Sequence, residues 1–134
     1  VYNHQGEYKK ALEYSLKSLD ISKLVYGENH PEVAAYYSHI GILCNNQGDY
    51  MKALEYSFKS LNINKSVYGD SHPAIALSYE NIGCIYASQG QPNKALENYL
   101  KSLEIQKSIY GDNHPKTIHT QKMILEMKSV PPLD

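Results

Sequence analysis

The sequence predicts an all-α protein made of stacked helical hairpins, and three observations lead to this fold class. Residues 6–31, 48–73 and 90–115 align without a gap at a spacing of 42 residues, and 14 of the 26 aligned columns are identical in all three copies. A fixed period of about 20–50 residues is typical of stacked repeat proteins. Apolar residues within each copy also recur at helical spacing. Finally, a glycine follows each apolar stripe, where a left-handed residue commonly ends a helix.

The complete middle repeat shows how each hairpin is specified. Pro31 fits the first turn of a helix, with His30 as its N-cap, and Gly48 provides the stop after that helix. A second helix follows Asp49 and ends before Gly69. The first helix carries the apolar stripe of Val33, Tyr37, Ile40, Gly41 and Cys44. Each repeat is therefore expected to be two antiparallel helices joined by short turns.

Applied to the whole chain, the same reasoning predicts a single repeat array over residues 1–134. A partial first repeat covers 1–30, complete repeats cover 31–72 and 73–114, a closing helix covers 115–129, and a short tail covers 130–134. The expected helices span residues 7–25, 32–46, 50–67, 74–88, 92–109 and 115–129.

Both ends of the array depart from the repeat. Residues 1–5 match only the tail of a first helix, so the helix expected to cover 7–25 is missing. Either the array is longer or a neighbouring molecule covers that face, and we expect a fragment of a longer protein. Near the other end, Leu125 replaces the glycine of the repeat and Gln121 replaces the tyrosine. This predicts a closing helix with a more polar outer face.

Small residues indicate where neighbouring helices touch. Gly41 and Gly83 fall in the middle of first helices, where glycine costs about 1 kcal/mol relative to alanine. A cost that recurs in one column is best explained by close approach of another helix backbone. The alanines of the second helices, Ala11, Ala53 and Ala95, offer the matching small surface.

These residues resemble a known repeat family. An aromatic residue, an apolar residue and glycine, followed by Gly-Asp-Tyr, Ala-Leu-Glu and a later leucine, are similar to the tetratricopeptide repeat. The 42-residue period and the Tyr-Gly-Asp-x-His-Pro junction resemble the long repeats of kinesin light chains. The resemblance implies a right-handed α-solenoid that serves as a protein-binding scaffold, with the first helix of each pair lining a concave groove.

Composition bounds the remaining functions. The 13 lysines, no arginine and 14 acidic residues leave a formal net charge of −1, without the basic footprint of a nucleic-acid-binding protein. No apolar run approaches the roughly 20 residues that span a bilayer. Cys44 and Cys84 occupy different repeat columns, which favours free thiols in the cytoplasm. No cofactor or metal site is predicted, because the His-Pro dipeptides at His30, His72 and His114 are better explained as helix caps.

The candidate binding residues lie on the groove face that the resemblance implies, opposite the packing stripe. They vary between repeats while their packing neighbours repeat, as expected of a site grafted on a scaffold. They are Ala35, Ser38, His39, Ile42, Asn45, Asn46, Leu77, Glu80, Asn81, Cys84, Ser88, His119 and Lys122. Ile42, Leu77 and Cys84 would supply apolar contact, while Asn45 and Asn81 could bind the backbone of a peptide.

Two functions follow from this sequence. The first is an interaction scaffold that binds a peptide or helix of a protein partner in the groove. The second is a structural spacer or self-assembly element that uses end-to-end stacking of helices. An enzyme is not predicted, because the chain has no paired-carboxylate site, nucleophile elbow or glycine-rich phosphate loop.

Overall fold

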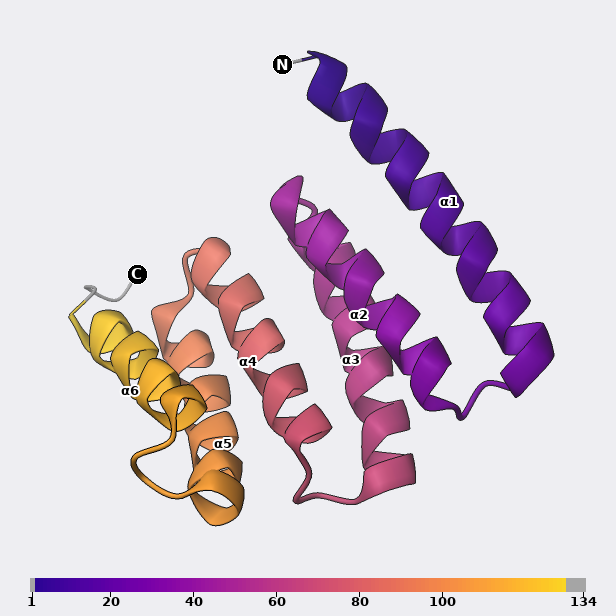
Figure 1. Cartoon of the computed structure of the whole chain (residues 1–134). Helices are drawn as coiled ribbons and strands as arrows, with labels where there is room; N and C mark the ends of the chain where they lie inside the picture. The colour runs from indigo at the N-terminus through magenta and orange to yellow at the C-terminus, as the bar shows by residue number, and fades with distance from the viewer. Residues whose placement is uncertain (1, 130–134) are drawn as a thin grey trace. The chain divides into compact units, whose positions relative to one another are not determined.

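The computed structural model describes residues 2–129 of the chain, and those residues form six α-helices and no strand (Figure 1). The helices are α1 (Tyr2–Tyr26), α2 (Pro31–Asn46), α3 (Tyr50–Tyr68), α4 (Pro73–Ser88), α5 (Pro92–Tyr110) and α6 (Pro115–Lys128). The all-α fold predicted from the sequence is therefore confirmed, and five of the six predicted helices differ from the observed ones by a single residue at one end. The predicted tail at 130–134 lies outside the described residues.

The start of the first helix was predicted wrongly. The sequence placed it at residue 7, after a glycine stop, but α1 is continuous from Tyr2 and passes through Gly6. The corresponding glycines Gly48 and Gly90 have φ of 82° and 79°, whereas Gly6 is not among the glycines with positive φ. Glycine permits a left-handed turn without imposing one. At Gly6 the helical conformation continues.

The chain divides into two compact units, residues 1–67 and 68–134. The first contains α1, α2 and almost all of α3, and the second contains α4, α5 and α6. In the first unit α1 packs on α2, and in the second α5 packs on both α4 and α6.

In the first unit, α2 supplies most of the fully buried side chains. Val33, Ile40 and Cys44 have no exposed surface, and Leu19 of α1 is also buried. Gly41 lies directly against the backbone of α3. A Cβ atom at this position would lie 3.2 Å from the carbonyl oxygen of Ala53 and 2.5 Å from the hydroxyl of Ser57. The predicted glycine–alanine contact is therefore present.

The second unit repeats this arrangement, with the larger side chain of Tyr99 against Gly83 where Ser57 lies against Gly41. A Cβ atom on Gly83 of α4 would lie 2.6 Å from the ring of Tyr99 and 3.2 Å from the carbonyl oxygen of Ala95. Tyr99, Ala95 and Ile124 of α6 form one buried cluster. In addition, the buried Ser102 hydroxyl donates a hydrogen bond to the Ala76 carbonyl oxygen at 2.8 Å, which joins α5 to α4.

The three His-Pro junctions are helix caps, as predicted. In each, the histidine Nδ1 accepts a hydrogen bond from the backbone N–H two residues later, at 3.0 Å for His30 and His72 and 3.1 Å for His114. Each imidazole also stacks on the tyrosine four residues earlier, with ring centroids 3.9 to 4.3 Å apart. A side-chain cap of this kind contributes about 1 kcal/mol to helix stability. The Tyr-Gly-x-x-His-Pro sequence thus fixes each turn between hairpins.

The closing helix α6 has a mixed outer surface. Lys122, Glu126 and Lys128 are exposed, as expected of a polar face, but Leu125 is 66% exposed beside them. The predicted polar outer face is therefore only partly present, because the leucine that replaces the repeat glycine points to solvent. Among the described helices, none is both long and apolar enough to cross a membrane.

The packing predicts opposite effects for the same substitution at two glycines. Gly83→Ala forces a methyl group against the buried Tyr99 ring, and we expect a loss of about 1–2 kcal/mol because overpacking outweighs the gain in helix propensity. Gly6→Ala meets no atom within 4 Å and should gain up to about 1 kcal/mol. Urea unfolding followed by circular dichroism measures both changes. Equal effects of the two substitutions would contradict the close-approach role of Gly83.

Candidate interaction surface

In the first unit, the predicted groove residues lie along α2. Ala35, His39, Ile42 and Asn46 are exposed on this helix. The other two, Ser38 and Asn45, are partly buried, and the Asn45 Oδ1 atom is buried without a hydrogen-bond partner among the described residues. The structure thus leaves four of the six side chains open to solvent.

In the second unit, the predicted residues lie on α4 and α6. Leu77, Ser88, His119 and Lys122 are exposed, while Glu80, Asn81 and Cys84 are partly buried. Leu77, Glu80 and His119 are brought together around one cavity. The remaining four do not line it.

This cavity, which we call the α4–α6 cavity, has a volume of about 380 Å³. Helix α4 supplies five lining residues, α5 supplies two, and Pro115, Lys116 and His119 come from α6. The residues that sequence reasoning missed are Pro73, Ala74, Ala76, Gln106, Tyr110, Pro115 and Lys116. No clear signal in the sequence pointed to Gln106, because its column is polar in all three repeats, with Ser22 and Asn64 at the equivalent positions.

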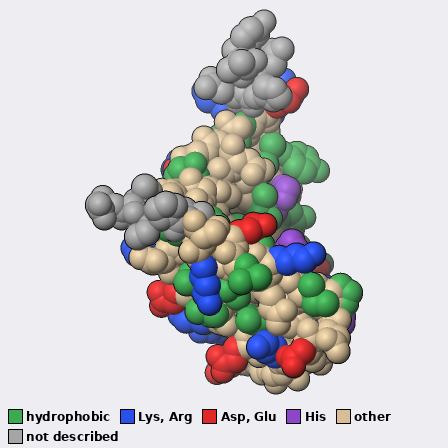
Figure 2. Space-filling view, turned by 90° about the vertical axis from the view of Figure 1, so that its left-hand side faces the viewer, with side chains coloured by type: hydrophobic (Ala, Val, Ile, Leu, Met, Phe, Trp, Pro, Cys, Tyr) green, Lys and Arg blue, Asp and Glu red, His purple; other side chains and the backbone are tan. Residues whose placement is uncertain are grey.

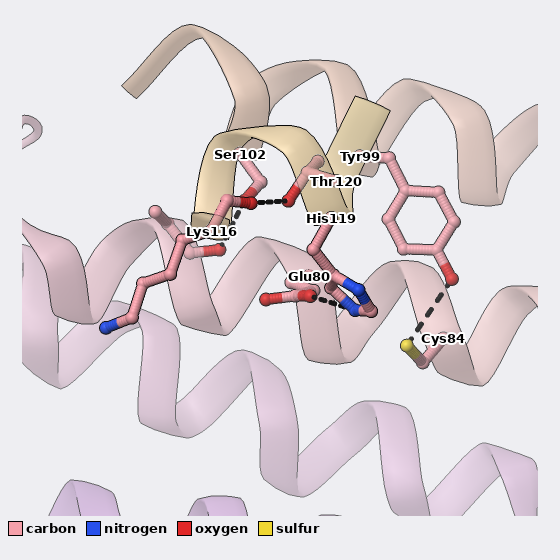
Figure 3. Close-up of polar contacts among 8 residues, drawn as sticks. Glu80, Cys84, Tyr99, Ser102, Lys116, His119 and Thr120 are labelled. Atoms are coloured by element: carbon pink, nitrogen blue, oxygen red, sulfur yellow. Dashed lines mark hydrogen bonds and ion pairs between the residues drawn. The ribbon is translucent and has the colours of Figure 1, made fainter. Parts of the chain in front are cut away.

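A carboxylate–imidazole contact lies at the cavity. His119 Nε2 is 3.6 Å from a Glu80 carboxylate oxygen, and the two side chains face one another between α6 and α4 (Figure 3). The Glu80 side chain is 18% exposed, against 64% for His119. Burial raises the pKa of Glu80, and the nearby His119 and Lys116 offset this only in part. Glu80 is therefore a desolvated carboxylate whose charge is incompletely compensated.

Cys84 has a different environment from the one the sequence suggested. It was expected to give apolar contact in the groove, but the Tyr99 hydroxyl donates a hydrogen bond to its Sγ at 3.4 Å (Figure 3). Burial raises the pKa of the Cys84 thiol, which makes the reactive thiolate scarce at neutral pH. Tyr8 and Cys44 form a similar contact at 3.6 Å in the first unit. Both cysteines are free thiols.

The first unit has a hollow of its own, of about 400 Å³, at the side of α2 that carries Tyr37. Its two lysines hold their ammonium groups over the Tyr37 ring, at 5.2 Å for Lys23 and 5.6 Å for Lys59. Such cation–π contacts stabilise the exposed ammonium groups by about 0.5–1 kcal/mol each. The lysines here serve the packing of Tyr37.

On the face that Figure 2 shows, charged side chains of both signs are interspersed, with hydrophobic side chains between them. Within the described residues, ion pairs join Lys52 of α3 to Asp49, which precedes that helix, and Lys101 to Glu97 on α5. This distribution agrees with the near-zero net charge of the sequence.

The sequence and the fold together define the class of this protein, an α-helical repeat protein built from paired helices. A family description of the tetratricopeptide repeat matches residues 1–56 and 34–108. The chain therefore belongs to the tetratricopeptide repeat family, as its motifs suggested. None of the curated proteins matches it.

Solved structures of similar fold agree. BtubC (BKLC) from P. vanneervenii aligns with a TM-score of 0.82 at 20% identity, over 94% of this chain and 50% of that one. A putative kinesin light chain with nearly identical TPR-like repeats from Podosopora anserina aligns with a TM-score of 0.74 at 20% identity, over 94% of this chain and 60% of that one. A single-substitution form of the latter protein gives 0.75 at 20% identity, over 92% and 58%. The chain thus spans half to three-fifths of the length of these structures, and the likeness shows the fold.

The environment of Glu80 predicts a pH-dependent stability effect. Between the ordinary value of 4.5 and its raised pKa, the folded state binds more protons than the unfolded state, so stability falls as the pH rises through this window. Glu80→Gln removes this loss, because the amide does not ionise. We expect the variant to melt at a higher temperature than the wild type at pH 7, with the difference disappearing as the pH falls below 4.5.

Thermal melts from pH 3 to pH 8 check this, with Glu104→Gln on the exposed surface of α5 as the control. A Glu80→Gln variant that is less stable than the wild type at pH 7 would show that the His119 contact outweighs the desolvation of Glu80.

Proposed function

We propose that this chain is a protein-interaction scaffold that binds a peptide or helix of a partner, and that the first helices α4 and α6 of its second unit provide the binding surface. The tetratricopeptide fold generally serves protein–protein interaction, which supports the class of function. We propose no catalytic activity and no cofactor, and the cytoplasmic location expected from the two cysteines stays a prediction.

The observation that carries this proposal is the α4–α6 cavity. Its wall is formed in part by Leu77, Glu80 and His119, which differ from the residues at the same positions of the other repeats. Leu77 is 55% exposed there, beside the apolar surfaces of Pro73 and Ala76. A partly open apolar hollow with a few polar groups is the usual form of a binding pocket for a side chain.

The test uses peptides selected on the protein itself. Random peptides are selected by display on the wild-type chain, and their affinity is measured by fluorescence anisotropy. Leu77→Asp should weaken binding at least ten-fold, which is about 1.4 kcal/mol, because it replaces an exposed apolar contact by a charge that the bound peptide would have to desolvate. The matched control is Leu100→Asp, at a leucine of α5 that is exposed in the same unit but outside the cavity. If Leu77→Asp leaves the affinity of the selected peptides unchanged, the peptides bind outside the α4–α6 cavity and the proposal is wrong.

A second function, self-assembly through the helix ends, is favoured by one observation on α1. Ile21 is 61% exposed, whereas Ile63 at the same repeat position of α3 is 8% exposed. Leu24, which is 87% exposed, and Val25 extend this apolar surface. Exposed apolar patches of this kind mark association surfaces.

Sedimentation velocity over a range of concentrations distinguishes the two functions. If self-assembly is the function, the wild type should associate at high concentration and Leu24→Lys should return it to a monomer. A wild-type chain that stays monomeric would remove this alternative.

A further inference from the structure

The α4–α6 cavity contains a buried group without a partner. Gln106 of α5 lines the cavity and is 3% exposed, and its Oε1 atom is buried without a hydrogen bond from any described residue. Buried polar atoms in folded proteins are nearly always hydrogen-bonded, and an unmade bond is costly. A donor supplied by a ligand would remove this cost.

Comparison of the three repeats shows that glutamine occurs at this column only in α5. The same column holds Ser22 in α1 and Asn64 in α3, which have shorter side chains. One turn earlier on α5, the buried Ser102 hydroxyl is satisfied by the Ala76 carbonyl oxygen. The column thus carries its longest polar side chain where the cavity is, and Gln106 is one of the residues that line the cavity.

The charges around the cavity favour a neutral ligand. Glu80 contributes a negative charge, Lys116 contributes a positive one, and His119 contacts Glu80. The ammonium group of Lys116 lies 5.5 Å from the centre of the Tyr110 ring, so it stays close to the rim. A charged ligand of either sign would meet both Glu80 and Lys116, so attraction and repulsion largely cancel while the cost of desolvating its charge remains.

The rest of the lining is largely apolar. Pro73, Ala74, Ala76 and Leu77 on α4, together with Pro115 on α6, surround the polar groups. The first backbone N–H groups of both helices are already capped, through Ala74 by His72 and through Lys116 by His114. These helix ends therefore add little attraction for an anion, and the free acceptor at Gln106 is the group that selects the ligand.

We propose that the α4–α6 cavity binds a neutral carboxamide carried on an apolar stem, the end of a glutamine side chain of the partner peptide. Its N–H₂ group donates a hydrogen bond to Gln106 Oε1, and its stem packs against Ala76 and Leu77. Its carbonyl oxygen accepts from the donors at the rim, Lys116 and His119. An amide offers two donors and one acceptor oxygen, which suits a cavity that contains groups of both kinds. This identification of the ligand rests on the proposed peptide-binding function.

The experiment uses four small molecules of nearly identical shape. Benzamide is neutral and donates hydrogen bonds, acetophenone is neutral without a donor, benzoate is an anion, and benzamidinium is a cationic donor. Each is titrated into the full ¹⁵N-labelled chain, and dissociation constants of millimolar order are measured from amide chemical shifts of α4, α5 and α6. We expect benzamide to bind at least five-fold more tightly than acetophenone, and more tightly than either charged molecule.

Two variants connect this preference to Gln106. Gln106→Met keeps the length of the side chain but removes the acceptor, so the preference for benzamide over acetophenone should disappear. The melting temperature should stay the same or rise, because an unsatisfied buried polar group has been removed. Thr117→Val is the matched control, since the Thr117 hydroxyl is also buried without a described partner in this unit but does not line the cavity. That variant should keep the preference.

Several results would overturn the proposal. They are a preference for benzamide that persists in Gln106→Met, equal binding of benzamide and acetophenone, tighter binding of a charged molecule, or no binding of any of the four. Gln106→Leu replaces Gln106→Met if the latter does not fold. Failure of the proposed function is a separate result, because no selected peptide would then depend on Leu77 while benzamide still bound to the cavity.

Discussion

The close approach of paired helices at a glycine is the constraint on which the rest of this structure depends. In the first unit Gly41 lets α2 approach the Ala53 carbonyl of α3, and in the second Gly83 lets α4 approach Ala95 and Tyr99 of α5. Glycine lowers helix stability at these positions, but this cost is offset because the absence of a side chain lets the two helices pack closely along their length. On the opposite face of the first helices, some residues are thereby left exposed, while others such as Asn45 and Glu80 stay partly buried. The exposed residues of that face, such as Leu77 and His39, can vary at little cost to the fold, which is the condition for a scaffold to carry a specific surface.

Most of the fold could be predicted from the sequence, because its determinants are local and occur three times. A glycine with positive φ at each turn, a histidine that caps the following helix and a proline in its first turn are each readable from a few adjacent residues. Repetition made the assignment of helix boundaries firmer, because the same boundary signals occur in all three copies of the repeat. Gly6 shows the limit of this reasoning. Gly6 occupies the same repeat position as Gly48 and Gly90, yet α1 continues through it. Glycine allows both helical and left-handed backbone conformations, so the residue type alone does not determine which one is adopted.

The candidate site was less predictable, for a geometric reason. Helical phase assigned Leu77, Glu80 and His119 to one face, and in the structure the three residues line one cavity between α4 and α6. It could not find Gln106, since α5 is a second helix and its repeated columns suggested packing alone. Nor could it show that Cys84 is held by Tyr99, a contact between residues in different helices. This cavity is lined by residues of three helices, and the spacing of residues along one helix does not show which residues of the other two lie beside it.

The two buried polar residues of α5 show how packing and recognition can be separated within one helix. Ser102 is fully buried and satisfied by the Ala76 carbonyl oxygen, so it fixes α5 against α4. Gln106, one turn later, is almost as buried, but its Oε1 atom has no donor within the described chain. If both groups served only the fold, an apolar residue at position 106 would stabilise it better than glutamine does. A polar group that costs stability and lies at an open cavity is therefore better explained by what enters the cavity than by what surrounds it.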